Sequence, residues 1–487
     1  MTRLLRYCAG LAAAAFIAAP QFACAHSRTP VLIQVTRNTE GEVEAPRIRS
    51  QQGSSIVFVS DGDVLGPGTA PGHREVYLYN AASGVTTRIT NTTGGESYEA
   101  ARETDDVNSG RDVFIAFIST GDFDPSVGNA DHNAEVFLWF EQTGTFVQVT
   151  NTLAPVQNGE IYASESGKCL TFRSNGDLDD NDGTDVGNPG RGFSNADGSN
   201  EIFNLAFGDT DFDPGLSVTT QISNGPAGTT SSHPVVGGYW FTRQCRSNAF
   251  QSDHDQLGNG SSGLHIYNYT KNTGVLEQLS KPGAGINRNP SMSSASNFAR
   301  GPFVVFETDT DPIGNGSAVY EIFRFRLFKN ELWQYTYATE DSARPAVSDG
   351  GGRMAFESKA DLFRPNRPLR SGDVPPFNSD ANSEIFLTKG KHQITQVTET
   401  SGCENNFPTL RDTGDAVAFR STCNLVGLNP AGVPQVFHYV LVDRDDALAT
   451  ANGCKTADGC CNEANGCFYL LFGAKQGPPR EGIRPQY

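Results

Sequence analysis

Short apolar strands alternate with polar, glycine-rich turns along almost the whole chain, and three strand patterns recur in a fixed order. The first is an apolar run that ends in Phe-x-Ser or a close variant. The second is an acidic residue followed by an aliphatic and an aromatic residue, and the third reads Gln-Val-Thr or similar. A strand that is apolar on both faces lies between two neighbouring sheets, because neither face meets water. The chain is therefore predicted to be all-β.

The three patterns repeat along the chain with similar spacing. The apolar run occurs at residues 56–60, 115–119, 170–174, 304–308, 354–358 and 417–421. The acidic pattern occurs at 75–77, 135–137, 201–203, 321–323 and 384–386, with looser copies at 264–267 and 435–437. The Gln-Val-Thr pattern occurs at 34–36, 88–90, 148–150, 221–223, 278–280, 334–336 and 396–398. In the fourth unit either 239–241 or 248–250 is the apolar strand.

A proline often precedes the apolar run in a short extended segment, as in Pro345-Ala346-Val347 and Pro408-Thr409-Leu410, and this segment supplies an innermost strand. Each unit is thus expected to have four strands. Such a sheet buries both faces only when neighbours stack on it, which predicts a seven-bladed β-propeller. The chain starts with a lone last-strand pattern, and the final unit after Pro408 lacks one. We expect residues 31–36 to complete the seventh blade and close the ring, which an open solenoid or a two-domain sandwich would not explain.

With these blade patterns the sequence resembles the TolB-like, WD-like propeller families over about residues 30–440. The resemblance implies the propeller fold. It implies no activity, because propellers of this kind host many unrelated functions.

The N-terminus has the features of a secretory signal peptide. Arg3 and Arg6 precede an apolar run at residues 11–19, and residues 23–25 fit a small-x-small cleavage site. A lipoprotein anchor at Cys24 is the alternative, but the residues before it do not suit one. The chain is predicted to comprise a signal peptide at 1–25, a propeller at 26–445 and a Cys-rich tail at 446–487.

The formal net charge is -18 at pH 7, and it becomes about -20 once the two arginines of the signal are removed. A chain this acidic does not suit nucleic acid or an anionic membrane surface as a partner. After the signal, no apolar run is long enough for a membrane helix. We expect a monomeric protein- or glycan-binding or scaffolding module in the periplasm or outside the cell.

Each unit carries an acidic loop between its second and third strands, and the richest follows the third apolar run. It offers Asp177, Asp179, Asn181 and Asp182 as oxygen ligands for Ca²⁺. Its register departs from an EF-hand, and Asp, Asn and Gly also favour tight turns without metal. No cofactor is expected apart from calcium at this loop, or calcium as a stabiliser of the whole ring; the tail cysteines are a separate case.

Eight cysteines remain after export, an even number that suggests disulfides in an oxidising compartment. Cys403 and Cys423 flank the first two strands of the seventh unit and are a plausible pair. Cys169 and Cys245 are left to pair by elimination. The tail cysteines are expected to form two disulfides of undetermined connectivity, although four thiolates could also hold zinc or copper; they are Cys454, Cys460, Cys461 and Cys467.

The sequence offers no catalytic or cofactor-binding set, since it lacks a Gly-x-Ser-x-Gly elbow, a P-loop and a His-Glu-x-x-His motif. The histidines fall in different units, mostly in loops. A propeller-type hydrolase or lyase acting on polysaccharide or peptide is the alternative function. It would require at least two histidines and an acid to converge at one mouth of the channel.

Overall fold

The computed structural model describes residues 28–49, 55–102, 113–164, 167, 169–178, 193–207, 218–238, 245–293, 302–362, 378–390 and 393–443. The predicted signal peptide at 1–25 and the tail at 446–487 lie outside these residues. Within them the chain forms strands and two short 3-10 turns, η2 (Lys271–Thr273) and η3 (Leu327–Lys329). The predicted all-β class is confirmed.

The strands form antiparallel sheets in sequence order. The first sheet contains β2 (Arg47–Arg49), β3 (Ser55–Ser60), β4 (Glu75–Asn80) and β5 (Val85–Arg88). The next contains β6 (Ser97–Arg102), β7 (Phe114–Ser119), β8 (Glu135–Phe140) and β9 (Thr145–Gln148). It is followed by β10 (Asn158–Ala163), β11 (Cys169–Ser174), β12 (Glu201–Ala206) and β13 (Val218–Gln221).

Two further groups of four strands share one eight-stranded sheet. The first group is β14 (Ser231–Gly238), β15 (Cys245–Ser252), β16 (Ser262–Thr270) and β17 (Val275–Gln278). The second is β18 (Ala284–Met292), β19 (Phe303–Thr308), β20 (Glu321–Arg326) and β21 (Glu331–Gln334). A short parallel pairing of β16 with β18 joins them. The apolar strand of the fourth unit is 248–250, inside β15, while 239–241 lies outside the described residues.

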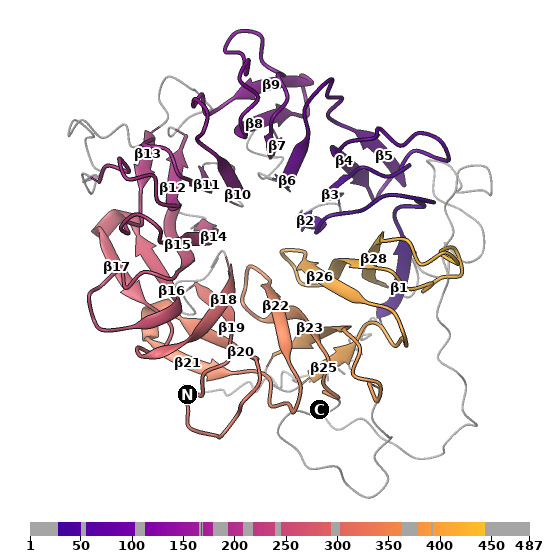
Figure 1. Ribbon diagram of the computed structural model, residues 1–487. Coiled ribbons are helices and arrows are strands. Elements are labelled where there is room, and N and C mark those ends of the chain that lie inside the picture. The colour runs from indigo at the N-terminus through magenta and orange to yellow at the C-terminus, as the bar shows by residue number, and fades with distance from the viewer. Residues whose placement is uncertain are drawn as a thin grey trace, which may run out of the picture.

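The last two sheets complete the arrangement. One contains β22 (Ser342–Val347), β23 (Arg353–Ser358), β24 (Glu384–Lys389) and β25 (Gln393–Gln396). The other contains β26 (Asn405–Leu410), β27 (Ala416–Ser421), β28 (Gln435–Asp443) and β1 (Arg28–Gln34). The strand β1 pairs with β28 along its whole length, with Gln34 opposite Phe437. The first strand of every group, from β2 to β26, faces a common centre (Figure 1).

The apolar strand patterns form the core because their aromatic residues meet across the sheets. In every group of four, an aromatic residue of the second strand stacks on one of the third strand, with ring centroids 5.5–6.4 Å apart. Phe419 and Phe437 form this pair in the sheet that holds β1. Apolar clusters fill the contacts between sheets, and one of them packs Ala418 and Val436 of the last sheet with Phe58 of the first.

Candidate functional site

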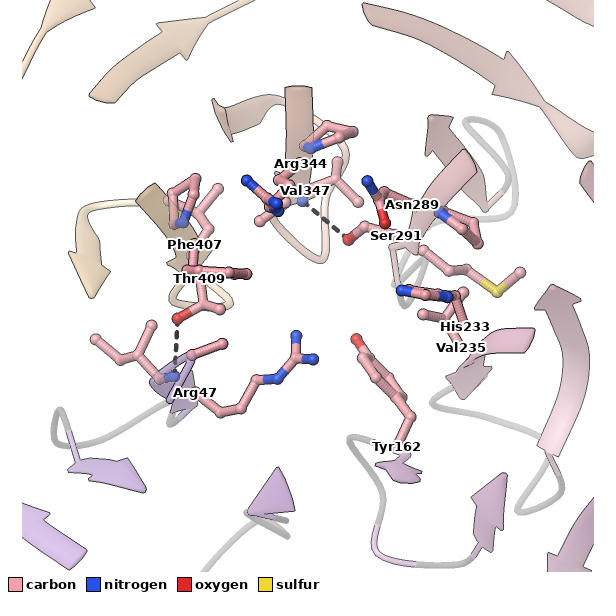
Figure 2. Close-up of a pocket in the computed structure, with 18 of the residues that line it drawn as sticks. Arg47, Tyr162, His233, Val235, Asn289, Ser291, Arg344, Val347, Phe407 and Thr409 are labelled. Atoms are coloured by element: carbon pink, nitrogen blue, oxygen red, sulfur yellow. Dashed lines mark hydrogen bonds between the residues drawn. The ribbon is translucent and has the colours of Figure 1, made fainter. Parts of the chain in front are cut away.

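A central cavity of about 370 Å³ lies between the first strands of all seven groups. We call it the channel cavity. Its wall includes residues of β2, β6, β10, β14, β18, β22 and β26. Side chains from these strands converge on one open space (Figure 2). Its volume lies within the range of about 300–1,000 Å³ that is typical of ligand pockets.

In six of these strands a β-bulge interrupts the pairing with the second strand of the group, because the first strand has one extra residue there. The bulge residue is not glycine, yet its φ is positive. These bulge residues are Glu99 (φ 41), Glu160 (φ 53), His233 (φ 50), Asn289 (φ 54), Arg344 (φ 48) and Phe407 (φ 54). In the first sheet the equivalent position is Ala45, between the pairs Val43–Ser60 and Arg47–Val57. All seven residues line the channel cavity. Non-glycine residues rarely adopt this backbone conformation, and such strain concentrates at functional sites.

Proline follows the bulge position in five of the seven strands, as at His233-Pro234 and Arg344-Pro345. Proline has no amide hydrogen to donate, so it suits an edge strand or a bulge. Four of these prolines mark innermost strands in the sequence pattern, whereas Pro234 and the residue before each proline were not recognised. That residue, which differs from unit to unit, was the available signal for the channel wall.

Side chains of the preceding sheet accept the backbone amides of five bulge residues, and the amide of Glu99 donates to Glu44 over 3.5 Å. The amide of His233 donates to Glu160 over 2.6 Å, and that of Asn289 donates to Gln251 over 2.9 Å. The other two donors are Arg344, which donates to Glu307 over 2.6 Å, and Phe407, which donates to Glu357 over 3.0 Å. The strained conformations are therefore tied to the contacts between neighbouring sheets.

His233 and Glu160 form the main titratable pair of the channel wall. The His233 Nδ1 lies 3.7 Å from Glu160 Oε1, and Arg173 Nε lies 3.5 Å from Glu160 Oε2. Burial lowers the pKa of His233, while the charge of Glu160 opposes that change. Burial thus favours the neutral imidazole, and the Glu160 charge favours the protonated form.

Two other carboxyl groups of the wall are perturbed in the opposite direction. Burial raises the pKa of Glu99, and the nearby charge of Glu160 raises it further, while Arg47 opposes both. Burial also raises the pKa of Glu44, against the effect of Arg74. This side of the cavity therefore holds negative charge in a place where water solvates it poorly.

A second layer of side chains lies two residues after each bulge. Arg47 and Tyr162 point into the cavity from this layer (Figure 2). Ser291 and Thr409 instead tie sheets together, because their hydroxyls accept the amides of Val347 (3.3 Å) and Ile48 (3.1 Å). The cavity thus combines acidic groups, basic donors and a phenol.

The opposite side of the channel carries a basic and an aromatic residue. The Arg344 guanidinium forms an ion pair with Glu357 and lies 4.3 Å from the ring centre of Phe407. Arg344, Phe407, His233 and Asn289 also line a second cavity of about 420 Å³, which we call the mouth cavity. The bulge residues therefore border both spaces.

The candidate calcium loop is described only in part. Asp177 accepts hydrogen bonds from the Ser194 hydroxyl (2.8 Å) and the Asn195 amide (3.1 Å). Asp179, Asn181 and Asp182 lie outside the described residues, so calcium binding stays a prediction. No group of three or more His, Cys, Asp or Glu side chains suited to a metal occurs in the described part of the chain.

The glutamates that open the third strand in five of the seven described groups are structural. Glu135 is fully buried and accepts hydrogen bonds from the Thr152 amide (2.6 Å) and from Asn158 (3.0 Å). Equivalent bonds recur at Glu75, Glu201, Glu321 and Glu384. Each carboxylate joins the third strand to the residues that follow the fourth.

The described histidines do not converge. His233 is the one that lines the channel cavity. His73 contacts Glu75 over 2.8 Å, His132 contacts the Thr120 carbonyl over 3.1 Å, and His265 and His438 are buried within their sheets. The condition set for the enzyme alternative, two histidines and an acid together, is not met among these residues.

Two disulfides are present in the described residues. Cys169–Cys245 links β11 to β15, with Cα atoms 6.1 Å apart. Cys403–Cys423 joins the segments that precede β26 and follow β27, with Cα atoms 5.3 Å apart. The four tail cysteines at 454, 460, 461 and 467 lie outside the described residues.

No known protein family and no curated protein matches this sequence. Among solved structures it is similar to an oligogalacturonate lyase from Vibrio parahaemolyticus, with TM-score 0.44, 11 % identity and coverage of 82 % of this chain and 98 % of that one. It is also similar to TolB from Acinetobacter baumannii, with TM-score 0.37, 13 % identity and coverage of 76 % of this chain and 81 % of that one. A prolyl endopeptidase gives TM-score 0.48 and 11 % identity, with coverage of 84 % of this chain and 51 % of that one.

The four-stranded antiparallel sheets of this chain are of the kind from which β-propellers are built. With TM-scores below 0.5, the likenesses carry no argument about family or activity. Membership of the TolB-like family stays a prediction. In the described residues, no helix is long and apolar enough to cross a membrane.

Proposed function

We propose that the chain is an exported, monomeric, seven-bladed β-propeller, closed by β1, which binds a protein or glycan ligand in its channel cavity. The seven groups of four strands and the pairing of β1 with β28 support the ring. The apolar cluster between the last and first sheets supports its closure. The two disulfides and the N-terminal sequence pattern support export.

One observation carries the binding proposal. Positions that the fold needs vary little from group to group: a buried Glu starts the third strand in five of the seven groups, and Gln435 takes its place in the group that holds β1. The bulge positions share a strained backbone but present acidic, basic, imidazole, amide and aromatic side chains. A repeat that keeps the backbone and varies the side chain builds one asymmetric surface, as ligand recognition requires.

The proposal is tested by a substitution that fills the channel cavity with a large side chain. Ser291→Trp places an indole at the channel wall, and Ser83→Trp places one at an exposed turn as the control. Full-length oxidised protein is immobilised and exposed to envelope extract and to a glycan array. We expect capture by the wild type and by Ser83→Trp, and loss of capture by Ser291→Trp. Equal capture by all three would contradict a channel site.

Calcium at the Asp177 loop is a separate proposal, supported by the density of oxygen ligands in that segment of the sequence. A ligand that binds only the folded state raises the melting temperature. We expect a higher melting temperature with Ca²⁺ than with a chelator, and Asp177→Asn should reduce the difference. An unchanged midpoint in both conditions would remove the proposal.

A further inference from the structure

We propose that the ligand of the channel cavity is a peptide segment whose ammonium or guanidinium group binds at Glu99, with its backbone carbonyl groups toward Arg47 and Tyr162. This inference rests on the proposed binding function and specifies its ligand class. The cation can come from a lysine or arginine side chain or from a peptide N-terminus. Both sources offer the same charge and the same hydrogen-bond donors.

Glu99 differs from the other two carboxylates on its side of the channel. Glu44 pairs with Arg74 over 3.4 Å, and Glu160 pairs with Arg173 over 3.5 Å. The carboxylate of Glu99 makes no hydrogen bond or ion pair with a described residue, although its side chain is exposed to the cavity. It is therefore the acidic group of this wall that is available to an incoming cation.

The surroundings of Glu99 favour a cation over a neutral donor. The pKa of Glu99 is raised by burial and by the charge of Glu160, so its ionised form lacks full compensation in the unliganded protein. A cation at this point supplies that compensation in a poorly solvated space, where charge-assisted hydrogen bonds are strong.

Arg344 and Arg47 are basic residues of the cavity wall, and they differ in how strongly they would repel the cationic group of the peptide. Arg344 lies across the channel, and its charge is balanced by Glu357. Arg47 comes from the deeper layer, and Figure 2 shows it beside Tyr162 with both side chains directed into the space. These two groups are hydrogen-bond donors, and peptide carbonyl or carboxylate oxygens are suitable acceptors for them. A peptide offers a cation to Glu99 and carbonyl oxygens to the wall with Arg47 and Tyr162, whereas a bare metal ion offers the charge alone.

The charge of the whole chain acts in the same direction. A net charge of -18 attracts basic partners at long range and repels acidic ones, including acidic glycans. The bulge residues Asn289 and Phe407 line both the channel cavity and the mouth cavity, so the two spaces lie on either side of the same residues.

The experiment uses the full oxidised protein and four short peptides, measured by calorimetry. Gly-Gly-Lys-Gly is compared with its norleucine analogue, each with a free and with an acetylated N-terminus. We expect the free norleucine peptide or the acetylated lysine peptide to bind, depending on the source of the cation, and the acetylated norleucine peptide to bind at least about tenfold more weakly. Glu99→Gln should weaken the cationic peptide about tenfold, and Glu340→Gln, which removes one exposed charge outside the cavity, should change affinity less than about twofold.

A charge-reversed variant distinguishes a specific role of the Glu99 charge from a general loss of folding. Glu99→Lys should melt cooperatively and prefer Gly-Gly-Glu-Gly to the lysine peptide. The inference is overturned if no peptide binds, if the acetylated norleucine peptide binds as well as the others, or if Glu99→Gln binds normally. The proposed function survives those results if Ser291→Trp still abolishes ligand capture, and it fails separately if that variant captures normally.

Discussion

The carboxylate of Glu307 accepts the backbone amide of Arg344 over 2.6 Å and so joins β19 to the bulge of the next sheet. Glu307 is fully buried, and it also accepts a hydrogen bond from Asn289 over 2.9 Å and pairs with Arg288. One side chain thus holds two neighbouring bulges in place.

Glu307→Ala should lower the free energy of unfolding by about 3 kcal/mol, because it leaves several part-buried donors without an acceptor. Denaturant titration measures the change. Glu331→Ala is the matched control, since its pair with Arg326 spans 3.4 Å at a partly exposed position and should contribute less than about 1 kcal/mol. Equal losses in the two variants would contradict a special role for Glu307.

Glu201 and Gln435 occupy the same position in two different sheets. Glu201 accepts the Gly225 amide over 2.7 Å, while Gln435 accepts the Asn38 amide over 3.1 Å. A neutral amide therefore fits this site. Glu201→Gln should change the free energy of unfolding by less than about 1 kcal/mol, whereas Glu201→Ala should lower it by about 3 kcal/mol.

Glu201 also makes the stability of the protein depend on pH, whereas a glutamine at this position does not. Burial raises the pKa of Glu201 above 4.5, so the folded state holds this proton more tightly than the unfolded state. Its stabilising contribution is present below pH 4.5 and is lost as the pH rises through the raised pKa. The stability of Glu201→Gln relative to the wild type should therefore increase between pH 4 and pH 7, as measured by urea titration at both values.

His438 is fully buried, and neither ring nitrogen has a hydrogen-bond partner among the described residues. Burial and the charge of Arg411 lower its pKa to about 3, against the effect of Asp415. The unfolded state binds the proton first, so stability falls as the pH drops from about 6.5 toward 3, by at most about 1.4 kcal/mol per pH unit. His438→Leu should reduce this acid sensitivity and leave stability at pH 8 similar. A parallel loss in both proteins between pH 7 and 5 would contradict the assignment.

The backbone strain at Glu99 can be measured apart from side-chain contacts, because its carboxylate has no partner among the described residues. Glu99→Gly should be more stable than Glu99→Ala by about 1 kcal/mol, since glycine adopts a positive φ without strain. At an extended position glycine is the less stable of the two. A thermal melt in which alanine exceeds glycine would show that the backbone is not strained here.

The two disulfides close loops of different length. Cys169–Cys245 spans 76 residues and Cys403–Cys423 spans 20, which corresponds to about 4 and 3 kcal/mol in the chain-entropy model. Replacing both cysteines of a pair by alanine should lower the midpoint of unfolding in each case, with the larger effect for the longer loop. Under reducing conditions the midpoints of unfolding of the variants and of the wild type should become similar.

The strands could be predicted from sequence because their signals are local. A Phe-x-Ser run reads as a buried strand, and the structure places one such strand second in each group. The choice between 239–241 and 248–250 could not be made, since both are short aromatic segments and only the pairing with β14 and β16 distinguishes them.

The channel wall was missed because its signal depends on tertiary structure. Proline before an apolar run indicated an inner strand, but the positive φ at Arg344 or Phe407 arises from a bulge whose amide is held by the neighbouring sheet. The acidic loops, in contrast, attracted attention by composition. The described Asp255 and Asp311 accept the amides of Gly260 and Gly316, both over 2.6 Å, and so cap turns of their own loops.

The bond between the Thr36 hydroxyl and Gln435 joins residues 399 positions apart in the chain. During synthesis the strand that precedes Thr36 emerges 399 residues before its partner. Until β28 has been made, β1 has no neighbour and its apolar residues stay in water or with a chaperone. Folding of this sheet is therefore a late event with a large entropic barrier, and truncation near residue 435 would leave both chain ends without their sheet.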